Sequence, residues 1–273
     1  MRTTAIRQVC HKQFAAWLIT LAVALLLSAC GKQAAAPITL GNRTSTSLRA
    51  VDSATAGSIS GTVHLDGPVP SGPAINMQSE AACAKAGTNG SSGQPVAVSN
   101  EGALANVVVY LTDGNGLARY RFDPPQTPVV LDQKGCMYEP RVVALMTHQV
   151  LEIRNSDATI HNVHAMPKAN SEWNKAQPAG GAVLRTSFPK AELAIPFMCN
   201  VHPWMRAFVF VFDHPYFAVT SADGKFIFRN VPPGTYRVSA WQEKLGTQTQ
   251  AVTVRSQSQA DVSFRFSSST PSK

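Results

Sequence analysis

The stretch PFMCNVHPWM, residues 196–205, places Cys199, His202 and Met205 three positions apart. An apolar run precedes this stretch, and the strongly β-forming run AFVFVF follows it at 207–212. The two flanking runs predict a pair of strands joined by a short loop. A thiol, an imidazole and a thioether on one loop can reach a common point, and this set of donors suits a transition-metal ion.

A second histidine-bearing stretch, NSDATIHNVH at 155–164, follows the β-type run at 150–153. Either His161 or His164 can supply another imidazole. One thiolate, two imidazoles and a weak thioether in near-trigonal geometry form a mononuclear blue-copper site. The two stretches together therefore predict copper rather than zinc, because methionine is a poor zinc ligand.

From about residue 132 to 212 the sequence resembles the cupredoxins of the plastocyanin and amicyanin type. The loop reads Cys-x2-His-Pro-aromatic-Met, and the string His-Asn-Val-His begins six residues after an asparagine. Within the family, this loop length and this string are most similar to those of amicyanin. The resemblance implies that Asn155 braces the two ligand loops, and it favours His161 over His164 as the first imidazole. By that match one type 1 copper per chain is held by His161, Cys199, His202 and Met205.

The same resemblance implies how the site exchanges electrons. In this family the loop histidine reaches the surface among apolar residues, so His202, Pro203 and Trp204 are expected to form a docking patch, with Met166 and Pro167 beside it. A redox partner such as a cytochrome or a dehydrogenase is expected to bind there in a small, transient contact. The sequence departs from the family in having Cys136 near the first strand and His148 where a turn glycine is common.

The remaining periodic segments are short, apolar and β-branched, and no long helical stripe occurs. Turn signals separate them, including Asp113-Gly114, Asp223-Gly224 and the PPG run at 232–234. These features predict an all-β chain. The β-type runs outside the two metal-binding stretches are 61–65, 106–111, 129–131, 225–228, 236–241 and 262–266.

The segment TSADGKFIFRNVPPGTYRVSAW, residues 220–241, resembles the carboxypeptidase regulatory-like, or transthyretin-like, β-sandwich. In that family a PPG turn directs a tyrosine into the core, and the first strands carry patterns found here far upstream. We therefore expect a discontinuous sandwich of residues 57–125 plus 213–268, into which a Greek-key cupredoxin sandwich of residues 128–212 is inserted. Three consecutive pieces packed together are the alternative.

The first 29 residues read as a lipoprotein signal peptide. A positive start containing Arg2, Arg7 and Lys12 leads into an apolar run, which ends in LSAC at 27–30. The pattern resembles a bacterial lipobox, which implies that Cys30 carries the lipid; an ordinary cleaved signal peptide is the alternative. Residues 30–56 are then expected to be a flexible tether, and the protein to face the periplasm, more at the outer than at the inner membrane.

The other cysteines can be assigned by their expected compartment. Cys10 leaves with the leader, and Cys83, Cys136 and Cys199 remain, an odd number for an oxidising environment. Since Cys199 is assigned to the metal, we expect a disulfide between Cys83 and Cys136. Three free thiols are the alternative.

The charge balance bears on partners. The formal charge of the 273-residue chain is +8, and removal of the three leader cations leaves +5, without basic clusters. Nucleic acid is therefore not an expected partner. The predicted function is a membrane-tethered electron carrier that is not an enzyme. The alternatives are a copper-holding or copper-delivery lipoprotein, or a β-sandwich module that binds carbohydrate or protein.

Overall fold

The computed structural model describes residues 48–72, 74–78, 80–85, 96–99, 101–112 and 116–268. The predicted signal peptide, the predicted lipidation site Cys30 and the predicted Asp113-Gly114 turn lie outside the described residues. Within the described ranges, no helix has the length and apolar character needed to cross a bilayer.

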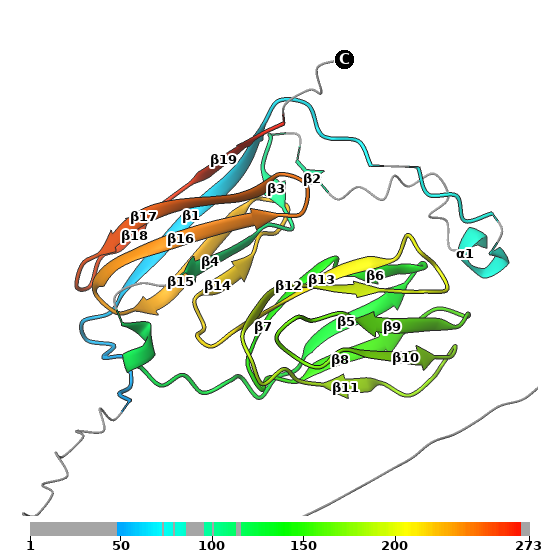
Figure 1. Ribbon diagram of the computed structural model, residues 1–273. Coiled ribbons are helices and arrows are strands. Elements are labelled where there is room, and N and C mark those ends of the chain that lie inside the picture. The colour runs from blue at the N-terminus through cyan, green and yellow to red at the C-terminus, as the bar shows by residue number, and fades with distance from the viewer. Residues whose placement is uncertain are drawn as a thin grey trace, which may run out of the picture. The chain divides into compact units, whose positions relative to one another are not determined.

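The described chain is built almost wholly from strands, which confirms the all-β class (Figure 1). The early elements are β1 (Gly57–Asp66), α1 (Ala81–Lys85), β2 (Ala97–Val98), β3 (Leu104–Ala105), β4 (Val108–Thr112) and η1 (Leu117–Arg119). The middle elements are β5 (Val129–Lys134), β6 (Met137–Glu139), β7 (Val142–Met146), β8 (Leu151–Asn155), β9 (His161–Ala165), β10 (Trp173–Gln177), β11 (Leu184–Thr186), β12 (Glu192–Met198) and β13 (Arg206–Phe212). The last elements are β14 (Phe217–Val219), β15 (Lys225–Val231), β16 (Gly234–Gln242), β17 (Gly246–Val254), β18 (Gln259–Asp261) and β19 (Phe264–Ser267).

Strands β5 to β13 form two sheets, in the orders β10-β9-β12-β13-β7 and β11-β8-β5-β6. We call this unit the inserted sandwich. Its core is made by alternate side chains of the strands, and Ile153, Val163, Phe197 and Val209 are completely buried in it. Such alternation is what a strand with one face on the core requires. His148, in the turn before β8, adopts a φ of 63°, a conformation more common for glycine.

The strands on either side of the inserted sandwich pair with one another. Strand β1 pairs antiparallel with β15 and parallel with β18 and β19, while β4 pairs with β14 and β16. We call this unit the flanking sandwich. A Cβ added at Gly61 would lie 1.6 Å from the carbonyl oxygen of Val262, so β1 needs glycine at this close approach. Tyr236 follows the PPG turn, is buried, and donates a 2.7 Å hydrogen bond to the carbonyl of Pro232.

An apolar cluster is shared by strands of both sandwiches. The Phe210 ring lies 4.9 Å from the Trp241 ring, and the Tyr110 ring lies 5.2 Å from the Phe212 ring. The strands concerned are β4 and β16 of the flanking sandwich and β13 of the inserted one. Aromatic pairs of this kind stabilise the fold by more than the burial of their apolar area alone.

Two expected boundaries need correction. The tether was predicted to reach residue 56, but Arg49 lies opposite Tyr120 in a parallel β-bridge, in which its N–H donates to Arg119 and its carbonyl accepts from Arg121. Residues 48–56 are therefore partly folded. Residues 57–125 were assigned to the flanking sandwich, yet Ile75, Met77 and Cys83 are buried in the core cluster of the inserted sandwich. Burial of apolar side chains is favourable in any core that has room for them, so position in the sequence alone does not decide which sandwich they join.

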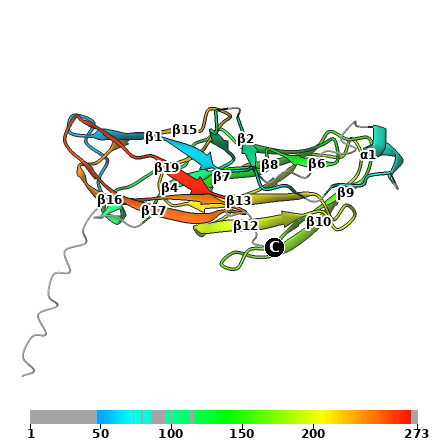
Figure 2. The same cartoon turned by 90° about the horizontal axis from the view of Figure 1, so that it is seen from above.

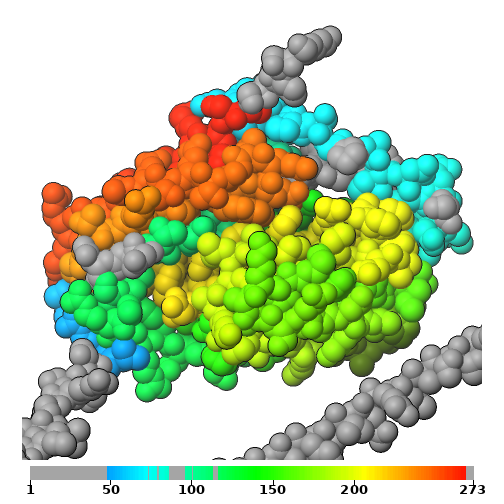
Figure 3. All heavy atoms as spheres, in the orientation of Figure 1, coloured from blue at the N-terminus to red at the C-terminus, as the bar shows by residue number. Residues whose placement is uncertain are grey.

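We call residues 75–78 and 80–85 the cover, because they lie over one end of the inserted sandwich. In both ribbon views α1 lies beyond the ends of β6 and β9 (Figures 1 and 2). The space-filling view shows the cyan atoms of the segment against yellow atoms of the later chain (Figure 3). The cover thus reaches the end of the sandwich where the candidate metal ligands lie.

Candidate metal site

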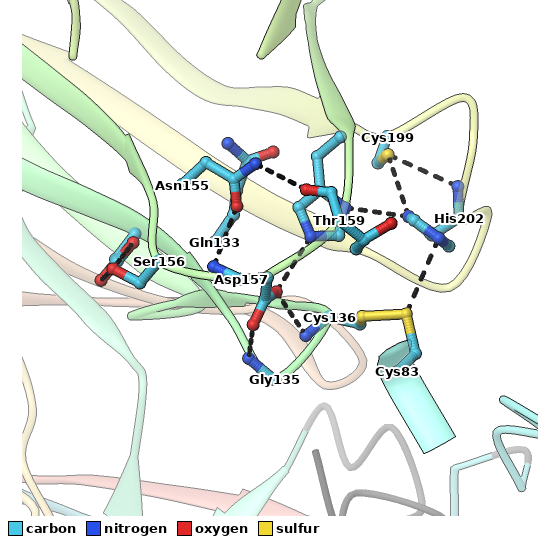
Figure 4. A network of polar contacts seen from close by, with 12 residues as sticks. Cys83, Gln133, Gly135, Cys136, Asn155, Ser156, Asp157, Thr159, Cys199 and His202 are labelled. Atoms are coloured by element: carbon cyan, nitrogen blue, oxygen red, sulfur yellow. Dashed lines mark hydrogen bonds and ion pairs between the residues drawn. A yellow bond between two sulfur atoms is a disulfide. The ribbon is translucent and has the colours of Figure 1, made fainter. Parts of the chain in front are cut away.

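Three donor atoms converge at one buried point. The Nδ1 atom of His161 lies 2.9 Å from the Nδ1 atom of His202, and the Sγ atom of Cys199 lies 3.7 Å from the same His202 nitrogen (Figure 4). None of the three side chains is exposed. His161 begins β9, Cys199 directly follows β12, and His202 lies in the loop before β13. Strand pairing between β9 and β12 therefore brings together residues that are about 40 positions apart in sequence.

Met205 belongs to the same loop and is completely buried in the core cluster that contains Cys199. Its backbone N–H donates to the carbonyl of His202 at 2.9 Å, and its carbonyl accepts the N–H of Cys199 at 3.2 Å. These bonds close the loop tightly at its base. The thioether is thus carried by the same loop as Cys199 and His202.

His164 lies outside this cluster. Its ring contacts Glu172 at 2.7 Å and Asn200 at 3.3 Å, and its side chain is 20% exposed. Of the two histidines left open by the sequence, His161 is the one whose ring nitrogen meets Cys199 and His202.

Asn162 joins the two ligand-bearing segments. Its Oδ1 atom accepts the backbone N–H of Asn200 at 2.7 Å and that of Val201 at 3.3 Å, and the thiol of Cys199 donates to it at 3.5 Å. The Tyr138 hydroxyl adds a bond to the carbonyl of Asn162 at 3.0 Å. One amide side chain therefore ties the start of β9 to the cysteine loop. The string His-Asn-Val contained this signal, since the residue after the first ligand is an asparagine.

The brace role expected of Asn155 is corrected by these contacts. Its amide group donates to the carbonyls of Thr159, Gln177 and Pro178, and its oxygen accepts the N–H of Asp157 (Figure 4). Asn155 therefore shapes the turn that leads to His161, whereas the bonds to the cysteine loop come from Asn162. It lies at the end of β8, whereas Asn162 lies on β9, next to β12.

Asp157 is a site residue that the sequence reasoning missed. Its Oδ2 atom lies 2.9 Å from the Nε2 atom of His161, and its side chain is only 12% exposed. The backbone N–H groups of Gly135 and Cys136 donate to the same carboxylate at 2.7 and 2.8 Å. The carboxylate thus links the β5–β6 turn to the ring of His161.

A disulfide joins Cys83 to Cys136, with an S–S distance of 1.99 Å. The Sγ atom of Cys83 lies 3.7 Å from the Nε2 atom of His202, and the Oε2 atom of Glu80 lies 3.9 Å from it (Figure 4). The indole N–H of Trp204 donates to the carbonyl of Cys136 at 3.0 Å. The cover is therefore attached directly above the outer edge of His202.

This arrangement corrects the expectation that the loop histidine reaches the surface. His202 is 0% exposed, because the cover lies over the ring edge that would otherwise face solvent. Its neighbour Pro203 is exposed, and Trp204 is half-buried.

The electrostatics of the site favour a metal-binding state of the thiol. Burial alone would raise the pKa of Cys199, but polar contacts with the His161 ring and with nearby backbone N–H groups outweigh it and lower that pKa. Burial lowers the pKa of His202. A thiolate and a neutral imidazole are the forms that bind metal ions. The donor set and its burial therefore fit a copper ion, with two nitrogens and a sulfur facing one point.

Comparison with known proteins finds a family match that includes the C-terminal strands of the flanking sandwich. The carboxypeptidase regulatory-like domain model matches residues 202–267, which run from the cysteine loop through β13 to β19. None of the curated proteins matches this chain.

Several solved structures resemble parts of the chain. A copper-containing nitrite reductase from Thermus scotoductus is 17% identical over 37% of this chain and 25% of its own, with a TM-score of 0.29. An amicyanin variant in the Cu(I) state is 22% identical over 31% of this chain and 81% of its own, with a TM-score of 0.28. A purple cupredoxin from Nitrosopumilus maritimus is 16% identical over 30% of this chain and 98% of its own, with a TM-score of 0.26. The chain is thus an all-β protein with cupredoxin-like structural neighbours and a carboxypeptidase regulatory-like domain match at residues 202–267.

Proposed function

We propose that this chain binds one copper ion as a type 1 centre and transfers single electrons without turning over a substrate. The observation that supports the proposal most strongly is the convergence of His161 Nδ1, His202 Nδ1 and Cys199 Sγ at one buried point. Met205 is the proposed axial ligand. Copper would supply the redox couple, and a soft thiolate with two imidazoles serves both of its oxidation states.

The protein's own residues keep the donors in place. Asn162 and the backbone bonds of the 199–205 loop fix the cysteine and the loop histidine, and paired strands hold His161 opposite them. Donors that already face one point need little rearrangement when the charge of the bound ion changes. Burial of the site excludes water and competing ligands.

The proposal extends to location and partner. We infer that Cys30 is lipidated and that the folded part faces the periplasm, since a buried disulfide suits an oxidising compartment. The partner would be a redox protein such as a cytochrome or a dehydrogenase. It would dock near Pro203, which is exposed, and Trp204, which is half-buried, both in the ligand loop.

A carrier is favoured over a delivery protein by the burial of the donors. All three side chains are inaccessible, and the cover lies over His202. A copper donor needs a route by which an acceptor's ligands can reach the ion. We therefore expect the copper-loaded protein to keep its ion through repeated cycles of oxidation and reduction in the presence of an apo acceptor. Prompt transfer to that acceptor would favour the delivery role instead.

The direct test is a Cu(II) titration of the soluble form that begins at Gly31, followed by visible spectroscopy. An intense thiolate-to-copper band is expected, and it should be absent in Cys199→Ser and His161→Ala. His164→Ala is the matched control and should keep the band, because its ring lies outside the cluster. A colourless wild-type protein would refute the copper proposal. Bleaching in His164→Ala but not in His161→Ala would refute the ligand assignment.

A further inference from the structure

The outer nitrogen of His161 has a charged partner inside the protein. The Nε2 atom lies 2.9 Å from Oδ2 of Asp157, while Nδ1 of the same ring faces His202 at 2.9 Å. A carboxylate accepts but does not donate, so the proton of a neutral ring lies on Nε2. The lone pair of Nδ1 is then directed at the point shared with Cys199.

The carboxylate of Asp157 is itself held from a separate part of the fold. Gly135 N–H donates to Oδ1, and Cys136 N–H donates to Oδ2. Gly135 and Cys136 both have positive φ, 64° and 54°, which turns their successive N–H groups toward one acceptor. Since Cys136 is also in the disulfide, this anchor is covalently secured to the cover.

The outer nitrogen of His202 has a different carboxylate environment from that of His161. The nearest carboxylate oxygen to its Nε2 atom belongs to Glu80 at 3.9 Å, beyond hydrogen-bond distance, and that side chain is 44% exposed. The Asp157 side chain is 12% exposed and in hydrogen-bond contact. The two imidazoles of the site therefore have unequal surroundings, one beside a buried charge and one beside a solvated charge.

We propose that Asp157 is a positioning residue that fixes the tautomer of His161 and favours the oxidised state of the site. This inference rests on the proposed function. A carboxylate on the outer nitrogen of a ligating histidine orients the ring and raises its basicity. Its negative charge stabilises the more positive Cu(II) form over Cu(I), since a buried charge is poorly screened.

The expected effect is measurable in the loaded protein. Asp157→Asn removes the charge and keeps the shape, and loss of such a partner lowers metal affinity by about 10- to 100-fold. A tenfold loss confined to Cu(II) corresponds to a rise of about 59 mV in the midpoint potential of a one-electron couple. Glu80→Gln is the matched control and should leave the potential unchanged, because water screens that carboxylate.

A second readout does not need copper. Nitrogen-15 NMR of the metal-free protein should show His161 protonated at Nε2, and Asp157→Leu should abolish this preference, whereas Glu80→Gln should keep it. A thiol count with one free sulfhydryl would verify that each variant retains its disulfide. Asp157→Glu should restore part of the wild-type potential.

The outcomes separate the two proposals. An Asp157→Asn protein with the visible band and the wild-type potential would overturn the inference, as would a His161 proton on Nδ1 in metal-free wild type. A wild-type protein that stays colourless with Cu(II) would overturn the proposed function, and the NMR result would still decide whether Asp157 positions the ring.

Discussion

The Sγ atom of Cys83 lies 3.7 Å from the Nε2 atom of His202, so a disulfide covers the outer edge of a candidate copper ligand. The contact joins α1 to the loop after β12, across 119 residues of sequence. It makes access to His202 depend on a bond that a reductant can break. Four predictions follow from this contact and from other specific interactions.

The first concerns the disulfide. It closes a loop across a sequence separation of 53, for which the chain-entropy model gives about 4 kcal/mol of stabilisation. In the double variant Cys83→Ser and Cys136→Ser, we expect the cover to open more often and His202 to react faster with an imidazole-modifying reagent. Peptide mass spectrometry measures the modification. His214, buried in the other sandwich, is the internal control and should react equally slowly in both proteins. Equal protection of His202 would show that apolar packing alone holds the cover.

The second concerns Asn162. Replacement by leucine removes the acceptor of the part-buried N–H groups of Asn200 and Val201, and a hydrogen bond of this kind contributes about 0.5–1.5 kcal/mol. We expect a lower free energy of unfolding by urea and an altered visible spectrum with Cu(II). Asn174→Ala is the control, because the side chain of this exposed residue accepts a bond from the amide nitrogen of Asn162, not from the oxygen that holds the cysteine loop. A variant as stable as wild type would mean that water molecules accept the hydrogen bonds of the loop N–H groups in place of Asn162.

The third concerns the ion pair between Arg141 and Glu243, which belong to different sandwiches. The guanidinium binds the carboxylate through two nitrogens at 2.5 and 2.9 Å, and the side chains are 16% and 8% exposed. Removal of one partner from a largely buried pair costs about 3–5 kcal/mol, so Glu243→Gln should strongly lower stability. Asp66→Asn breaks an exposed pair with Arg265 and should cost less than about 1 kcal/mol. Denaturant unfolding measures both, and similar losses would argue against a special role for the Arg141 pair.

The fourth concerns the pH dependence of stability through Glu192. Burial would raise the pKa of this carboxyl, but the backbone N–H groups of Lys168, Ala169 and Asn170 outweigh it and hold the pKa below its usual value. A depressed pKa means that the folded state binds this proton less readily than the unfolded state. The stabilisation is therefore present above the unfolded pKa and is lost as pH falls through the folded one.

For the metal-free protein we expect Glu192→Gln to be less stable than wild type at pH 7, with a difference that shrinks under acidic conditions. Thermal unfolding at several pH values measures it. Glu172→Gln is the control, since its side chain is 63% exposed and contacts the ring of His164. A constant difference between Glu192→Gln and wild type from pH 7 to pH 3 would contradict the assignment.

Local sequence determined much of the fold. The β-branched and aromatic runs at 129–131, 207–212 and 236–241 all lie in strands, because such side chains pack well on the pleated surface of a sheet. The spacing of Cys199, His202 and Met205 placed all three on one loop. Elimination among the cysteines led to the pairing of Cys83 with Cys136, because the compartment and the metal left few alternatives.

Other features depend on contacts between distant segments. Asn155 and Asn162 have the same side chain and both lie near His161 in the sequence, and the pairing of β9 with β12 decides that Asn162 reaches the cysteine loop. Nothing local in the sequence indicates that Asp157 accepts N–H groups from Gly135 and Cys136, because that contact requires β5 and β8 to lie side by side.

The cover over His202 is the clearest case. A sequence motif specifies which side chains a short loop carries, since neighbours along the chain cannot move far apart. The burial of those side chains depends on every other segment that packs on them. For His202 that segment lies more than one hundred residues upstream, and apolar burial of Ile75 and Met77 together with one disulfide brings it there.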